Sequence, residues 1–150
     1  MCSDVIRKRF EDLTPSDLYN ILDLRGEVFL IEQKIFYLDT DGKDQKSMHW
    51  FIMDGDVMVS YLRVLPPGLK YGEHSIGRVA TKASYRRQGL ASKLINAVIA
   101  DLQGKPIRIS AQAYLESYYA RFGFKTVSEV YIEEGLEHVE MLFSGDGSGT

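Results

Sequence analysis

An extended segment runs into an amphipathic helix through a basic turn. This feature limits the folds that the chain can adopt more than any other. The stretch Ser75–Lys82 predicts a strand, and an apolar residue at every fourth position predicts a helix from about Gly89 to Gln103. Small residues at this turn let a ligand approach the backbone, and the free N–H groups of a helix start favour an anion. The segment predicts either a phosphate or pyrophosphate site or a basic loop that caps an ordinary helix.

The motif within this turn differs from two common phosphate-binding loops. The sequence contains no G-x-x-x-x-G-K-[ST] and no G-x-G-x-x-G, which argues against a Walker-type loop and against a dinucleotide fold. The motif present is R-x-x-G-x-A, from Arg86 through Gly89 to Ala91.

The rest of the chain predicts a mixed sheet flanked by helices. Alternating or continuous apolar runs between turn residues predict the other strands, which are Val5–Phe10, Met48–Met53, Val57–Leu65, Ile107–Gln112, Phe124–Tyr131 and His138–Phe143. Apolar residues at helical spacing predict helices from about Pro15 to Gln33, with a bend at Gly26, and from Leu115 to Phe122. The order β-α-β-β-β-α-β-α-β-β is that of an α/β chain of the α+β type. We expect one domain over residues 1–143 and a flexible C-terminal tail over 144–150.

Composition excludes several functional classes. With 150 residues and a formal net charge of −3, the chain has no bulk electrostatic attraction for nucleic acid. Its one cysteine, Cys2, excludes an internal disulfide and a multi-cysteine metal site. No apolar run approaches the roughly 18 residues of a membrane helix, and no signal-peptide core follows Met1. We therefore expect a cytoplasmic protein without a membrane or nucleic-acid partner.

The basic turn resembles the Q/R-x-x-G-x-G/A signature of the GCN5-related N-acetyltransferase (GNAT) superfamily, and Tyr119–Phe124 resembles its Y-x-x-x-G-F segment. Dispersed segments resemble the ElaA-like branch in particular. These are Val28–Gln33, Tyr37 with Asp39 and Asp41, His49, Ile76–Val79, Ala111–Ala113, Phe122–Phe124, Glu129–Tyr131, Gly135, His138 and Met141. Together they cover nearly the whole chain outside the tail.

The resemblance implies the acyl-CoA N-acyltransferase fold, with a central, mostly antiparallel sheet whose strands Ser75–Lys82 and Ile107–Gln112 splay apart. It also implies acetyl-CoA as co-substrate and direct transfer of acetyl to a primary amine in a ternary complex. The implied cofactor residues are Val79 and Thr81, which pair their backbones with the pantetheine arm, and the pyrophosphate loop of Arg86, Arg87, Gln88, Gly89, Leu90, Ala91 and Ser92.

The chemistry requires an acid and a means of deprotonating the acceptor. A lysine-like amine with a pKa near 10.4 is almost wholly protonated at pH 7, so a base or a desolvating slot must supply the neutral form. By resemblance Tyr119 is the general acid that protonates the departing thiolate, although core packing would also explain a tyrosine there. Candidate base or acceptor-site residues are Glu32, His49, Gln112 and His138. Structural roles for the histidines, and a water relay from backbone carbonyls, are alternatives.

The acidic stretch that follows the first predicted helix lacks the pattern of a calcium loop. An EF-hand beginning at Asp39 would need a glutamate where this chain has Trp50, so we expect no metal. The alternatives are a solvated turn and an electrostatic role, in which Asp39 and Asp41, with Glu32, attract a cationic amine. The second alternative predicts that acidic acceptors react worse than cationic ones.

Two other functional classes stay open beside the enzyme. A catalytically silent acyl-CoA sensor would share the loop and differ at Tyr119, whereas a protein-interaction module would need neither. The acceptor could be a small-molecule amine or a protein amine, because a fold does not choose among them. The sequence predicts no oligomeric state.

Overall fold

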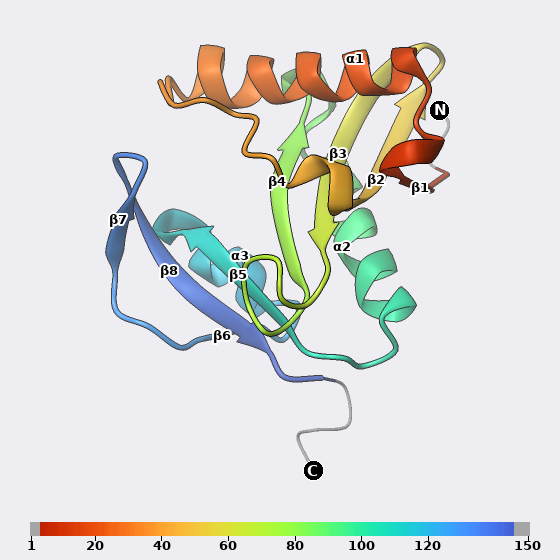
Figure 1. Ribbon diagram of the computed structural model, residues 1–150. Helices are drawn as coiled ribbons and strands as arrows, with labels where there is room; N and C mark the ends of the chain where they lie inside the picture. The colour runs from red at the N-terminus through yellow and green to blue at the C-terminus, as the bar shows by residue number, and fades with distance from the viewer. Residues whose placement is uncertain (1–3, 146–150) are drawn as a thin grey trace.

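The computed structural model describes residues 4–145 (Figure 1). The residues outside that range include Cys2 and most of the tail that we expected to be flexible. The strands are β1 (Ile6–Arg9), β2 (Met48–Asp54), β3 (Val57–Leu65), β4 (Ser75–Thr81), β5 (Ile107–Gln112), β6 (Lys125–Thr126), β7 (Tyr131–Glu133) and β8 (Leu136–Phe143). The helices are α1 (Pro15–Arg25), continued by the π-helical η2 (Gly26–Glu32), then α2 (Leu90–Asp101) and α3 (Glu116–Ala120).

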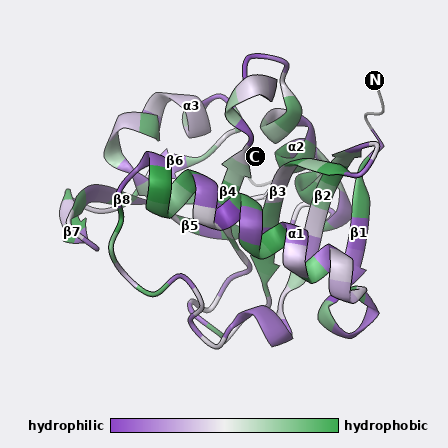
Figure 2. Ribbon diagram, turned by 90° about the horizontal axis from the view of Figure 1, so that it is seen from above, coloured by the Kyte–Doolittle hydropathy of each residue, from purple (hydrophilic) through white to green (hydrophobic). Residues whose placement is uncertain are grey.

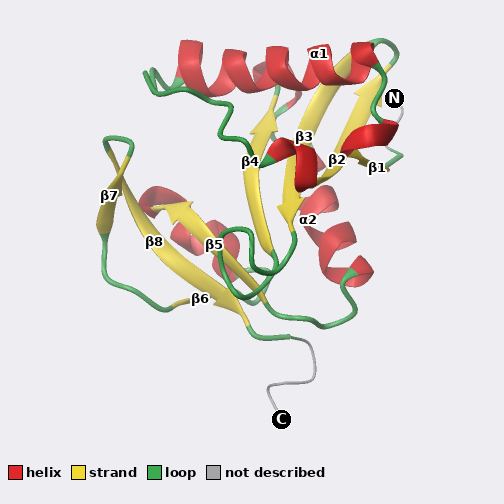
Figure 3. Ribbon diagram, viewed as in Figure 1, coloured by secondary structure: helices red, strands yellow, loops and turns green. Residues whose placement is uncertain are grey.

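The strands form two sheets that meet at one end. The first has the antiparallel order β1-β2-β3-β4, and the second has the order β5-β8-β6, with β7 also paired to β8. Among the described residues one parallel bridge, between His74 and Ile107, joins the sheets, supported by a 2.9 Å hydrogen bond from Arg108 N to the His74 carbonyl. Beyond it, β4 and β5 diverge, as Figure 3 shows. The mixed α/β architecture and the splayed pair agree with the prediction.

Helices cover the two faces of the first sheet. Viewed from above, α1 and its continuation cross β2, β3 and β4, with apolar and hydrophilic residues mixed along the helix (Figure 2). Leu24 and Val28 pack there against Tyr61. On the other face, Leu94 and Val98 of α2 belong to the main core. Because both faces are covered, eight of the nine residues of β3 are buried.

The first helix begins where the sequence predicts. Thr14 Oγ1 accepts a hydrogen bond from Asp17 N, and Asp17 Oδ2 accepts one from Thr14 N, each at 3.0 Å. The predicted bend at Gly26 is a change from α- to π-helical hydrogen bonding, and η2 carries the chain as far as Glu32.

The last part of the chain differs from the prediction. Phe124–Tyr131 is not one strand: two residues pair as β6, and β7 begins only at Tyr131. Between them Ser128 Oγ accepts a 2.8 Å hydrogen bond from Glu140 N in place of a backbone carbonyl. This side-chain contact takes the place of a backbone hydrogen bond between strands. Val130 is consequently 57% exposed.

Candidate active site

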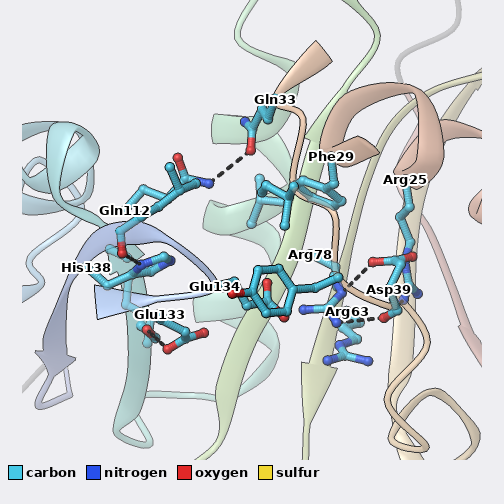
Figure 4. A pocket seen from close by; sticks show the side chains of 18 of the residues that line it. Arg25, Phe29, Gln33, Asp39, Arg63, Arg78, Gln112, Glu133, Glu134 and His138 are labelled. Atoms are coloured by element: carbon cyan, nitrogen blue, oxygen red, sulfur yellow. Dashed lines mark hydrogen bonds and ion pairs between the residues drawn. The ribbon is translucent and has the colours of Figure 1, made fainter. Parts of the chain in front are cut away.

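The two sheets enclose a cavity of about 500 Å³ where β4 and β5 diverge. We call this cavity the cleft. Its floor is formed by residues 75–79 of β4 and 109–112 of β5, with Tyr119 of α3 beside them. Residues of η2 and of the following loop form one wall, and the β7–β8 turn forms the other (Figure 4).

An irregularity in β4 shapes the floor of the cleft. Tyr61 and Arg63 of β3 pair with Ala80 and Gly77, so β4 contains an extra residue between these positions. Arg78 lies in this bulge with a φ of +54°, a conformation that non-glycine residues rarely adopt.

The free edge of β4 presents backbone groups away from β3. Lys82 N donates to the Val59 carbonyl at 2.9 Å, so the preceding residue, Thr81, faces the opposite way. The Thr81 carbonyl accepts instead from Arg86 Nε at 3.0 Å. Val79, two residues earlier on the same strand, lines the cleft.

The loop before α2 has the features of an anion site. Gly89 is the N-cap residue, with a φ of +75°, and no side chain caps the first N–H groups. Arg86, Arg87 and Gln88 are exposed, whereas Leu90 is buried in the core and offers only its backbone. The uncapped N–H groups of a 12-residue helix, flanked by two arginines, fit a phosphate or pyrophosphate.

Two further residues of the loop belong to the first turn of α2. Ala91 and Ser92 are half-buried in the first turn of α2. Ser92 Oγ lies 3.0 Å from the hydroxyl of Tyr118. Tyr118 therefore supports the loop.

Tyr119 lines the cleft and is otherwise buried, with 7% of its surface exposed. Its ring packs edge-to-face against Tyr118 and Phe124. Burial, and then the neighbouring Tyr118 and Tyr114, raise the pKa of Tyr119 above its ordinary value. The phenol is therefore protonated at neutral pH and able to donate a proton.

His138 and Gln112 lie on the β5–β8 side of the cleft (Figure 4). His138 Nδ1 is 2.9 Å from the Leu136 carbonyl. A carbonyl only accepts, so in the neutral ring Nδ1 carries the hydrogen and Nε2 keeps its lone pair. Gln112 Nε2 donates across the cleft to Gln33 Oε1 at 3.1 Å.

The other two candidate bases lie outside the cleft lining. His49 is fully buried, with its ring nitrogens 2.6 Å from the Tyr61 hydroxyl and 2.8 Å from the Asp44 carbonyl. Burial lowers the pKa of His49, and no substrate can reach the ring, so we correct the expectation that His49 is a candidate base. Glu32 is exposed and ion-paired to Arg86, a contact that lowers the pKa of Glu32.

Three arginines neutralise the acidic loop. Asp39 pairs with Arg25 Nε at 2.8 Å and with Arg78 Nε at 2.9 Å. Asp41 pairs with Arg63 Nη2 at 2.6 Å. Asp39 and Asp41 are therefore not free charges, which corrects the expectation that they attract a cationic acceptor.

Sequence reasoning missed several residues that line the cleft. The sequence places Gln33 only at the end of a helix, and Glu133 and Glu134 only between two predicted strands. Arg63 and Arg78 were not singled out, although a charged residue within the apolar run of β3 is a signal for a buried ion pair. Among residues 4–145, no group of three or more metal-ligating side chains could hold an ion. The helices of this part of the chain are all too short or too polar to cross a membrane.

Comparison with known proteins agrees with this geometry. Residues 27–144 match the family model of the acetyltransferase (GNAT) domain. The chain is 40% identical over 141 residues to the UPF0039 protein sll0451 of Synechocystis, covering 91% of this chain and 92% of that protein.

Two solved structures share the fold over nearly their whole length. An acyl-CoA N-acyltransferase from Pseudomonas aeruginosa superposes with a TM-score of 0.87 at 37% identity, covering 93% of this chain and 97% of that one. ElaA of Escherichia coli gives a TM-score of 0.86 at 32% identity, with 95% and 99% covered. The chain therefore belongs to the GNAT acetyltransferase family, in its ElaA-like branch.

Proposed function

We propose that the protein transfers acetyl from acetyl-CoA directly to a primary amine in a ternary complex. The observation that carries this proposal is the combination of the uncapped start of α2, the outward-facing backbone of Thr81 at the edge of β4, and Tyr119 in the lining of the cleft. An extended pantetheine arm can pair with such an edge while the pyrophosphate meets the helix N-terminus.

In the proposed reaction the amine nitrogen attacks the thioester carbonyl, a C–N bond forms, and the C–S bond breaks. The departing thiolate takes the proton of the Tyr119 hydroxyl, and solvent later returns a proton to Tyr119. A thiol pKa near 8.5 makes the thiolate a moderate leaving group, which a phenol with a higher pKa can still protonate.

His138 is the base that the geometry favours. Its Nε2 lone pair is left free by the Leu136 contact, and the ring borders the cleft. The ring stacks on Tyr131 at 6.1 Å, which fixes its orientation. It takes the proton that the amine loses, either directly or through one water.

Release of free CoA from acetyl-CoA in the presence of a panel of amines tests the proposal. Replacing Tyr119 with phenylalanine removes the acid and keeps the packing, so we expect kcat to fall about 100-fold while acetyl-CoA binding persists. The matched control is Tyr19→Phe, at a tyrosine of α1 that is 73% exposed.

Unchanged turnover in Tyr119→Phe would contradict the assigned acid. Binding of acetyl-CoA without turnover of any amine would instead favour the silent sensor.

A further inference from the structure

We infer that the acceptor carries a carboxylate as well as its amine, and that Arg78 with Lys70 binds this carboxylate. The inference rests on the proposed function and names the acceptor class of the same site: a small amino acid–like amine rather than a plain amine. Four observations support it, at Arg78, in the surrounding charges, at Lys70 and in the acidic side chains of the cleft.

The first observation is the strained position of Arg78 on the cleft floor. Its φ of +54° is a conformation that costs a non-glycine residue on the order of 1 kcal/mol. Such backbone strain persists where surrounding contacts impose it, and strained residues are found most often at functional sites. Here the bulge turns the side chain of Arg78 into the cleft lining, where it is 22% exposed.

The contacts of Arg78 leave one edge of its guanidinium available. Nη2 donates to the Asp39 carbonyl at 2.7 Å, and Nε lies 2.9 Å from Asp39 Oδ1. Nη1 makes no hydrogen bond with any residue in the described part of the chain. The loop therefore holds the guanidinium through Nε and Nη2, and the two hydrogens of Nη1 remain able to donate to a carboxylate.

The second observation is a shortage of hydrogen-bond acceptors around this arginine. Arg25, Arg63 and Arg78 face the three carboxylates of Asp39, Asp41 and Asp44, so the charges of these side chains balance. Even so, the buried Nε of Arg63, a residue that also lines the cleft, has no hydrogen-bond partner among the described residues. The cluster has more donors than its carboxylates satisfy, which favours one more anionic group nearby.

The third observation is Lys70, which lines the same cleft and is exposed. Its Nζ lies 5.3 Å from the centre of the Tyr71 ring and makes no ion pair with the described residues. Since the arginine charges are balanced, Lys70 adds a positive charge to the cleft that no carboxylate of the described residues pairs with.

The fourth observation is that the cleft also carries acidic side chains. Glu133 at the end of β7 and Glu134 in the following turn line the cleft (Figure 4). Glu133 accepts a 2.9 Å hydrogen bond from Ser110. A cleft that holds cationic side chains as well as glutamates fits a dipolar acceptor, whose carboxylate meets Arg78 and whose amine lies toward the glutamates and the base.

Matched pairs of acceptors test the inference. We would measure kcat/KM for ω-amino acids from glycine to 6-aminohexanoate and for n-alkylamines of the same carbon number. We expect the carboxylate to raise kcat/KM at least tenfold for one chain length or more. The preference should fall to within about threefold in Arg78→Asn, because asparagine tolerates a positive φ and lacks the guanidinium.

Two lysine variants complete the design. Lys70→Gln should reduce the preference in part. Lys125→Gln removes the same charge from an exposed residue of β6 and should leave the preference intact. Equal kcat/KM within every pair, or a full preference in Arg78→Asn, would overturn the inference.

A binding measurement separates this inference from the proposed function. If no amine releases CoA, the proposed transfer fails, and the same pairs are titrated by calorimetry into the chain saturated with coenzyme A. Tighter binding of the amino acids, lost in Arg78→Asn, would still support the carboxylate site. Equal binding, or none by any amino acid, would overturn it.

Discussion

At the scale of single residues, burial sets the chemistry of Tyr119. A phenol in water has a pKa near 10, and desolvation disfavours its charged form. Tyr119 lines the cleft but is only 7% exposed, so burial raises its pKa and keeps the proton on the hydroxyl at neutral pH.

This raised pKa has a direct consequence for the pH dependence of kcat. In the proposed reaction Tyr119 acts in its protonated form, so its contribution is present below its pKa and is lost only as pH rises through that value. We therefore expect no loss of kcat from Tyr119 up to pH 10. A pH–rate profile from 6 to 10 checks this. An alkaline loss with a midpoint below 10 that disappears in Tyr119→Phe would contradict the account.

At the scale of elements, the start of α2 combines an unusual backbone with an open surface. Gly89 has a φ of +75°, and a Cβ placed there would meet nothing within 4 Å. An alanine at Gly89 is strained by about 1 kcal/mol, and its methyl group projects where a pyrophosphate would approach. We expect Gly89→Ala to lower stability by that amount and to weaken acetyl-CoA binding at least fivefold, measured by chemical unfolding and calorimetry.

Gly55 provides the matched control. It lies in the β2–β3 turn with a φ of +61° and has equally open surroundings. Gly55→Ala should therefore cost similar stability and leave acetyl-CoA affinity unchanged. Equal affinity in both variants would contradict the placement of the pyrophosphate.

The loop between η2 and β2 is fixed by ion pairs rather than by apolar packing. Burial alone would raise the pKa of Asp41, but hydrogen bonds from Arg63 outweigh it and hold this pKa below the ordinary value. A carboxyl with a depressed folded-state pKa stabilises the fold above its unfolded-state pKa, near 3.9, and that stability is lost as pH falls.

We therefore expect the free energy of unfolding to decline below about pH 4, and to decline less steeply in Asp41→Asn. At pH 7 the same variant should be less stable than the parent by about 1–3 kcal/mol, because Arg63 loses a charged acceptor. Urea unfolding from pH 2.5 to 7 measures both effects. Parallel curves for the two proteins would show that Asp41 does not anchor the loop.

At the scale of the whole molecule, local patterns predict elements better than they predict the site. Strands β3 and β5 have the predicted bounds, because their composition and turns are encoded within a few residues. The strand predicted over Phe124–Tyr131 was wrong because Ser128 meets Glu140 through a side chain, whereas the predicted His138–Phe143 lies within β8. The contact between Gln33 and Gln112 joins residues 79 positions apart. Nothing local encodes such a contact.

The family resemblance, by contrast, points to the proposed cofactor loop and to Tyr119 as the proposed acid, since these follow short motifs. The prediction that the acidic loop attracts a cationic acceptor was wrong for the opposite reason. Asp39 and Asp41 are close together in sequence, but the arginines that neutralise them come from α1, β3 and β4. Their charge state follows from the tertiary fold.

The most direct test of the account is thermal unfolding with acetyl-CoA, with ATP as the phosphate-bearing control. A ligand at a hundred times its dissociation constant adds about 2.7 kcal/mol to the stability of the folded state. For a chain of this size that raises the Tm by about 5–10 °C. We predict this rise with acetyl-CoA and none with ATP. No rise with acetyl-CoA, or an equal rise with ATP, would contradict an acyl-CoA site on this chain.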